Sequence, residues 1–189
     1  MLRSWPAIVL CLSSACDTTA PPASSAIQAG TTAAAPLPAD MVRACPGLKR
    51  PDRSASACTD IGCLNGFQLN VSPSSGWAAG MYQFELTVDG RAITCQGAIP
   101  LLPCSEPSFP CDADGVRLGV SGCALPATQQ GIASIMFDGY PEAVSLRVLR
   151  NGSELQHADL TPTYTSSQPN GKGCEPVCCS AGAELSLQP

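Results

Sequence analysis

Twelve cysteines in a chain of 189 residues are the feature that most restricts how this sequence can fold. Structural zinc sites use pairs of cysteine or histidine ligands at short, regular spacing. The chain contains no C-x2-C pair and only one histidine, His157, so neither a metal site nor another cofactor is predicted. Disulfide bonds formed in an oxidising compartment explain the cysteine content better, and we expect a fold stapled by several bridges.

The first sixteen residues have the organisation of an export signal. Met1–Arg3 is short and positively charged, Trp5–Leu12 is an apolar run, and small residues precede Cys16. A run of this length is too short for a permanent membrane span but is typical of a cleaved signal peptide. The stretch Leu-Ser-Ser-Ala-Cys resembles the lipobox of bacterial lipoproteins, whose cysteine receives lipid and becomes the mature N-terminus.

This resemblance implies that residues 1–15 are removed and that a lipid on Cys16 anchors the protein in a membrane of the cell envelope. Leu12 lies four residues before the cysteine, whereas the family usually places a leucine three before. A small-residue cleavage site followed by plain secretion is therefore the alternative. Cysteine parity favours the lipoprotein: without Cys11 and with Cys16 lipidated, ten cysteines remain, and an even number can pair completely.

Composition divides the rest of the chain into two parts. Residues 16–57 form an Ala/Thr/Pro/Ser-rich linker that cannot bury enough apolar surface to offset the entropy cost of ordering. Residues 58–189 carry nine of the cysteines and twelve of the fifteen acidic side chains, against five basic ones. An acidic domain with few aromatic residues repels phosphate backbones, so we expect no nucleic-acid partner.

Alternation of apolar and polar residues after residue 58 predicts strands rather than helices. In Phe67–Val71 and Tyr82–Val88 every second residue is apolar, which is the pattern of half-buried strands. Asp89-Gly90 and Asn151-Gly152 join consecutive runs, and both dipeptides favour tight hairpins because they tolerate positive φ. The predicted strands are 67–71, 82–88, 91–99, 116–120, 132–137, 144–148, 154–160 and 181–187.

About eight short strands joined by turns predict an all-β fold, an antiparallel β-sandwich stapled by disulfides. The strand count and hairpins of residues 60–188 resemble an immunoglobulin-like sandwich. With its lipobox-like start and its linker, the chain resembles bacterial surface lipoproteins that carry a Cys-rich domain of this type, a family to which we attach no activity.

Two disulfide bridges follow from local sequence. Cys104 and Cys111 flank a short proline-rich loop, which predicts a bridge between them. Cys63 is in phase with the apolar face of the first strand and Cys179 with that of the last. Parallel pairing of these terminal strands would therefore allow a Cys63–Cys179 bridge.

The adjacent cysteines Cys178 and Cys179 should take separate partners, because a bridge between neighbours is strained. Connectivity is otherwise open, with Cys95–Cys123 and Cys45–Cys58 as further pairs. The candidates for bridging are Cys45, Cys58, Cys63, Cys95, Cys104, Cys111, Cys123, Cys174, Cys178 and Cys179. A catalytic thiol is not expected among them, because it requires a nearby base.

A serine hydrolase would need a nucleophile beside a histidine that a carboxylate orients. His157 and Asp159 lie two residues apart in a predicted strand and so share one face. No G-x-S-x-G or comparable nucleophile turn accompanies them. We therefore interpret His157 as a partly exposed strand residue, and no catalytic residue is predicted.

Two features allow a ligand. Asp112 and Asp114 lie in an Asp-Ala-Asp-Gly turn that resembles the start of a calcium loop, but the rest of that motif is missing. An irregular calcium site would need Glu106 or Asp138 as well, and a plain acidic turn is the simpler interpretation. Trp77, in a glycine-flanked loop, could stack on a sugar, although packing on the open end of the sandwich explains it better.

The sequence thus predicts a non-catalytic envelope module, membrane-bound through its lipid, that binds another envelope protein or a glycan or has a structural role. A carbohydrate- or calcium-binding accessory domain is the first alternative, and a hydrolase using His157 and Asp159 is the second.

Overall fold

The computed structural model describes residues 37–49 and 57–188, and most of its regular structure is β-strand. The strands of this described part are β1 (Gly66–Pro73), β2 (Gly80–Val88), β3 (Arg91–Ile99), β4 (Val116–Ser121), β5 (Gly131–Phe137), β6 (Val144–Arg150), β7 (Ser153–Leu160), β8 (Thr165–Ser167) and β9 (Cys178–Leu187). One short α-helix, α1 (Ala39–Ala44), precedes them, and a 3-10 turn, η1 (Ala127–Gln129), lies between β4 and β5.

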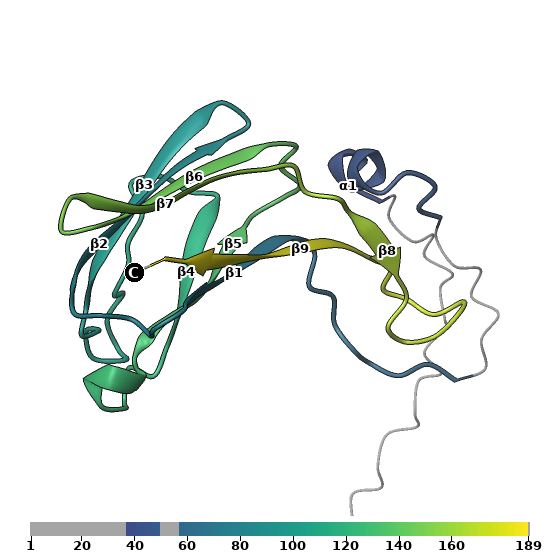
Figure 1. The fold of residues 1–189 in the computed structure, drawn as a ribbon. Helices are drawn as coiled ribbons and strands as arrows, with labels where there is room; N and C mark the ends of the chain where they lie inside the picture. The colour runs from purple at the N-terminus through teal and green to yellow at the C-terminus, as the bar shows by residue number, and fades with distance from the viewer. Residues whose placement is uncertain (1–36, 50–56, 189) are drawn as a thin grey trace, which may run out of the picture. The chain divides into compact units, whose positions relative to one another are not determined.

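The strands form two sheets packed face to face (Figure 1). Sheet A has the order β4-β5-β1-β9-β8, and sheet B has the order β3-β2-β6-β7. Neighbouring strands are antiparallel except β1 and β9, which run parallel over eight residue pairs from Gly66–Ser180 to Pro73–Leu187. Pairing of the first strand with the last thus lies inside sheet A, whose edges are β4 and β8. The domain is an immunoglobulin-like β-sandwich, as the sequence predicts.

The core lies between the sheets and is built from the alternating apolar residues of the strands. Phe84 and Leu146 from sheet B and Leu69 and Ile135 from sheet A are completely buried. Apolar side chains that alternate with polar ones can occupy only one face of a strand. The alternation in the sequence therefore gives each sheet an apolar inner face and a polar outer face.

Both predicted hairpins are confirmed. Asp89 and Asn151 have φ values of 48° and 51°, and each is followed by a glycine with positive φ. Asparagine and aspartate tolerate this region because their short side chains bond nearby backbone. The Asn151 Oδ1 accepts the N–H of Met81 at 2.9 Å, which fixes the hairpin against the start of β2.

The sandwich has two different ends. At the three-bridge end, where β1 and β9 begin, lie α1, β8 and the disulfides of Cys45, Cys58 and Cys63 (Figure 1). At the opposite, loop end lie the turn that contains Trp77, the η1 turn and the end of β9. Because β9 runs from one end to the other, it connects the two.

The sequence prediction missed three elements, α1, β8 and η1, and misplaced one boundary. Six-residue α1 is too short to show a helical period, and β8 has three residues, all exposed. Met41 of α1 and Cys45 are buried with Cys179 at the three-bridge end. The described residues 37–49 of the predicted linker 16–57 therefore belong to the folded unit rather than to a spacer.

Candidate functional site

All ten cysteines of the described part of the chain form disulfide bonds. The pairs are Cys45–Cys179, Cys58–Cys174, Cys63–Cys178, Cys95–Cys111 and Cys104–Cys123. Complete pairing indicates an oxidising compartment, and the adjacent cysteines 178 and 179 take separate partners as predicted. The four individual pairs predicted from sequence, however, are wrong.

The predicted Cys63–Cys179 bridge is off by one residue, although β1 and β9 are parallel. Gly66, at the start of β1, has a φ of 94°, so the alternation of the strand does not extend back to Cys63. Cys63 therefore reaches Cys178. Cys179, in β9, is fully buried at the three-bridge end and bonds to Cys45 next to α1.

The predicted Cys45–Cys58 bridge is replaced by two long-range bridges, and the buried side chain of Asn170 explains the position of the segment around Cys58. Its Oδ1 accepts the Thr59 hydroxyl and the Ile61 N–H, both at 2.7 Å. Its Nδ2 donates to the carbonyl oxygens of Ile61 and Glu175. These four hydrogen bonds hold residues 59–61 against the 170–175 loop, which brings Cys58 to Cys174.

The predicted Cys104–Cys111 and Cys95–Cys123 bridges exchange partners. Residues 110–112 run beside β3. The backbone N–H of Gln96 donates to the Pro110 carbonyl at 3.2 Å, and the backbone N–H of Asp112 donates to the Thr94 carbonyl at 2.9 Å. This places Cys111 opposite Cys95 instead of Cys104. A single pairing of backbone along β3, invisible in the cysteine spacing, thus decides both bridges.

His157 lies on the outer face of sheet B and is exposed. Its Nε2 lies 3.2 Å from the Ser145 Oγ and 3.6 Å from the Asp159 Oδ1. A catalytic triad needs the serine and the carboxylate on different ring nitrogens, so that the carboxylate orients the imidazole that takes the serine proton. Here both groups approach one nitrogen on an open surface, so this cluster lacks the triad geometry.

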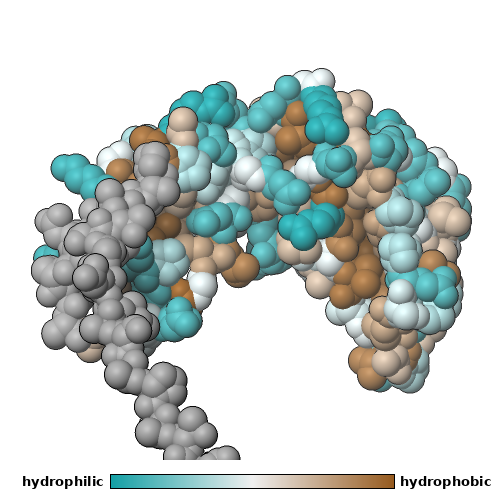
Figure 2. All heavy atoms as spheres, turned by 180° about the vertical axis from the view of Figure 1, so that it is seen from behind, coloured by the Kyte–Doolittle hydropathy of each residue, from teal (hydrophilic) through white to brown (hydrophobic). Residues whose placement is uncertain are grey.

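Ionic contacts surround that histidine. Arg147, which pairs with His157 across β6 and β7, forms ion pairs with Glu85 and Glu154. The pKa of Arg147 is raised, mainly by its hydrogen bond to Glu154 and then by the charges of both carboxylates. Seen from behind, hydrophilic residues predominate along the upper edge of the domain (Figure 2).

In the Asp-Ala-Asp-Gly turn, the first aspartate has a structural role. The Asp112 Oδ1 accepts the N–H of Thr94 at 2.8 Å and so fastens the turn to β3. Asp114 is exposed, and Asp138, one of the proposed additional ligands, forms an ion pair with Arg117 at 3.0 Å. Among the described residues, no cluster of three or more side chains suited to a metal occurs.

Trp77 packs on the loop end of the sandwich, which is the role that its sequence context favours. Its ring lies edge-on to Tyr82, with the centroids 5.2 Å apart. A Cβ added at Gly131 would lie only 2.2 Å from a Trp77 ring carbon, so the indole fits directly over this glycine. Trp77 therefore has an established packing partner and does not stand free beside a groove.

Two tyrosines connect α1 to the sandwich at the three-bridge end. Tyr140 and Tyr164 meet edge to face with their centroids 5.5 Å apart, and the Tyr164 hydroxyl donates to the Pro141 carbonyl at 2.9 Å. Burial, followed by the charges of Asp89 and of Tyr140, raises the pKa of Tyr164 far above its usual range. Burial and then Asp40 raise the pKa of Tyr140. Both phenols are therefore neutral.

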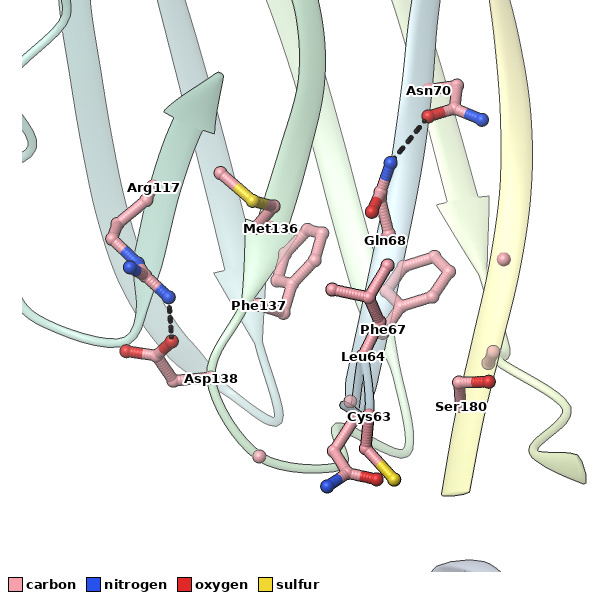
Figure 3. A pocket seen from close by; sticks show the side chains of 15 residues that line it. Cys63, Leu64, Phe67, Gln68, Asn70, Arg117, Met136, Phe137, Asp138 and Ser180 are labelled. Carbon is pink, nitrogen blue, oxygen red and sulfur yellow. Dashed lines mark hydrogen bonds and ion pairs between the residues drawn. The ribbon is translucent and has the colours of Figure 1, made fainter. Parts of the chain in front are cut away.

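A depression of about 530 Å³ lies on the outer face of sheet A, toward the three-bridge end (Figure 3). Its floor is a row of residues that face one another across four strands: Arg117 on β4, Met136 on β5, Gln68 on β1 and Gly182 on β9. Asn70 extends it along β1, and Leu64, which is 82% exposed, borders it at the three-bridge end. The sequence analysis did not single out these residues, because they come from distant segments.

Neither protein-family models, nor curated proteins, nor solved structures match this chain. The predicted export signal and the predicted lipidation site Cys16 lie outside the described residues. In the described part, no helix has the length and apolar character needed to cross a membrane.

Proposed function

We propose that the chain is an exported lipoprotein, anchored through Cys16, whose sandwich is a non-catalytic binding module of the cell envelope. The observation that carries this proposal is the complete pairing of the ten cysteines after residue 44. Complete pairing leaves no partner in the described domain for Cys16, which agrees with its modification by lipid. A module in an oxidising compartment also gains from covalent staples that resist unfolding.

The arrangement of the bridges supports a tethered module. Three of them, through Cys45, Cys58 and Cys63, join the N-terminal side of the domain to residues 174–179. A chain held by its N-terminal segment would thus be held at the three-bridge end. The surface features of the domain support binding more than catalysis, since His157 lacks triad geometry while sheet A carries a hollowed face.

Anchoring is tested with Cys16→Ala in the bacterial host. The wild type should fractionate with membranes and carry an acylated N-terminal cysteine without residues 1–15, as measured by intact mass. The variant should appear in the soluble exported fraction with five bridges intact. A soluble, unmodified wild-type protein would refute anchoring and leave the secreted alternative.

The non-catalytic assignment is tested with His157→Gln. This exposed substitution should change the free energy of unfolding by no more than about 0.5 kcal/mol. Cells that carry it should retain the wild-type phenotype in a complementation assay, with a deletion strain as reference. A folded variant that fails to complement would contradict the assignment and favour a hydrolase centred on His157.

A further inference from the structure

Gly182 has no structural reason to be a glycine. It lies in the middle of β9 without a positive φ, and a Cβ added there would meet only the Gln68 carbonyl oxygen, at 3.9 Å. Glycine weakens a strand interior, and it marks places where a ligand or another backbone approaches closely. Gly66, by contrast, has positive φ and backbone oxygens within 3 Å of its added Cβ. The missing side chain of Gly182 opens the depression on sheet A without serving the fold.

The side-chain amides beside Gly182, those of Gln68 and Asn70, offer one acceptor and one donor. The Gln68 Nε2 donates to the Asn70 Oδ1 at 2.9 Å, which fixes the orientation of both amides (Figure 3). The remaining atoms of the two amides, the Gln68 Oε1 and the Asn70 Nδ2, have no hydrogen-bond partner within the described part of the chain. Such groups on an outer sheet face can serve a ligand that carries both an N–H and a C=O.

The rest of the lining is uncharged overall and partly apolar. Arg117 is neutralised by Asp138 at 3.0 Å, so the depression presents no net charge from this pair. The Met136 side chain lies next to Gln68 across β5 and β1, and Leu64 projects over the same strand. The lining therefore suits a neutral ligand that has a small apolar group close to an amide.

We propose that this depression binds an N-acetylated sugar unit of an envelope glycan. An acetamido group supplies an N–H for the Gln68 Oε1, a C=O for the Asn70 Nδ2 and a methyl group for Met136. The sugar ring would lie over Gly182, where a larger side chain would exclude it. The volume of about 530 Å³ is in the range of about 300–1,000 Å³ that small-ligand sites occupy. This inference deepens the binding role proposed above and rests on it.

The test is isothermal titration of the purified, fully oxidised protein with tri-N-acetylchitotriose, and with cellotriose as the matched trisaccharide without acetamido groups. We expect binding of the first and at least about tenfold weaker binding of the second, a difference of about 1.4 kcal/mol. Gly182→Val should fill the gap and weaken chitotriose binding at least tenfold, a similar difference of about 1.4 kcal/mol. Ser186→Val is the control, because Ser186 lies on the same strand and face, outside the depression.

Failure of the folded wild type to bind chitotriose, or equal binding of cellotriose, would overturn the acetamido assignment. An equal loss in Gly182→Val and Ser186→Val would overturn the location of the site. Thermal melts of both variants check that they are folded, which is expected because a Cβ at Gly182 makes one ordinary contact, at 3.9 Å, and Ser186 is exposed. Failure here would leave the membrane fractionation of Cys16→Ala unaffected, so the two proposals fail separately.

Discussion

Removal of the Cys63–Cys178 bridge, by replacing both cysteines with serine, should cost much less than its span suggests. The two residues are 115 apart in sequence. Treated as the only cross-link, such a loop restricts the unfolded chain by about 4.8 kcal/mol at 25 °C in the chain-entropy model. The neighbouring Cys58–Cys174 bridge changes this value, because it already closes nearly the same loop.

With Cys58–Cys174 intact, the Cys63–Cys178 bridge closes only a short additional loop, made of residues 58–63 and 174–178. A loop of about ten residues contributes about 2.7 kcal/mol in the same model. The double variant should therefore lose about 2.5–3 kcal/mol of unfolding free energy. Loss of all three bridges at this end should cost clearly more than any single loss, since the long loop is then open.

The assay is guanidinium denaturation of the wild type and the double variant, followed by tryptophan fluorescence, with thiol titration to show that four bridges remain. The matched control is Cys104→Ser with Cys123→Ser, which opens a separate loop of 19 residues. Its predicted loss is about 3 kcal/mol. A loss near 5 kcal/mol for the Cys63 and Cys178 variant would refute the reasoning, because it would mean that the bridges act independently.

Three further results are expected. Asn170→Ala should destabilise the protein by about 1–3 kcal/mol, because it leaves buried backbone groups of the 59–61 segment unpaired; a chemical melt with unchanged stability would contradict this. Gly131→Ala should cost about 1–3 kcal/mol through collision with Trp77, and Trp77 fluorescence should shift as the indole moves. Stability should fall as pH rises above about 10, where the unfolded chain ionises its tyrosines. The folded Tyr164 still retains its proton there, because its pKa is raised, so its contribution to the unfolding free energy is complete below that pH and decreases above it. Tyr164→Phe should therefore make the loss of stability at high pH smaller.

The strands could be predicted because each carries its own signal. Every predicted strand is present within a few residues, and the 91–99 strand has the predicted bounds. Local alternation and the Asp89-Gly90 and Asn151-Gly152 turns are properties of neighbouring residues. The parallel pairing of the first and last strands, which the immunoglobulin-like resemblance suggests, is present as well.

The disulfide pairs and the depression could not be predicted, because they depend on contacts between distant segments. The positive φ at Gly66 interrupts the strand alternation, so that Cys63 bonds to Cys178 instead of Cys179. Residues 110–112 pair with β3 through backbone hydrogen bonds, which no side-chain pattern indicates. Gln68, Met136 and Gly182 become neighbours only when β5, β1 and β9 pair. One clue was available: a glycine in the middle of an otherwise regular strand pattern indicates a special environment.

The Cys45–Cys179 bridge also has a mechanical consequence. It joins the residue after α1 to the second residue of β9, so a pulling force that enters at residue 45 passes through covalent bonds into that strand. The Cys63–Cys178 bridge links the same end of β9 to the segment before β1, which prevents the two parallel strands from sliding apart under load. A force applied to the N-terminal segment can therefore unravel α1, which precedes Cys45, but beyond that residue it passes through covalent bonds into β9, and reduction of these two bridges would remove that path.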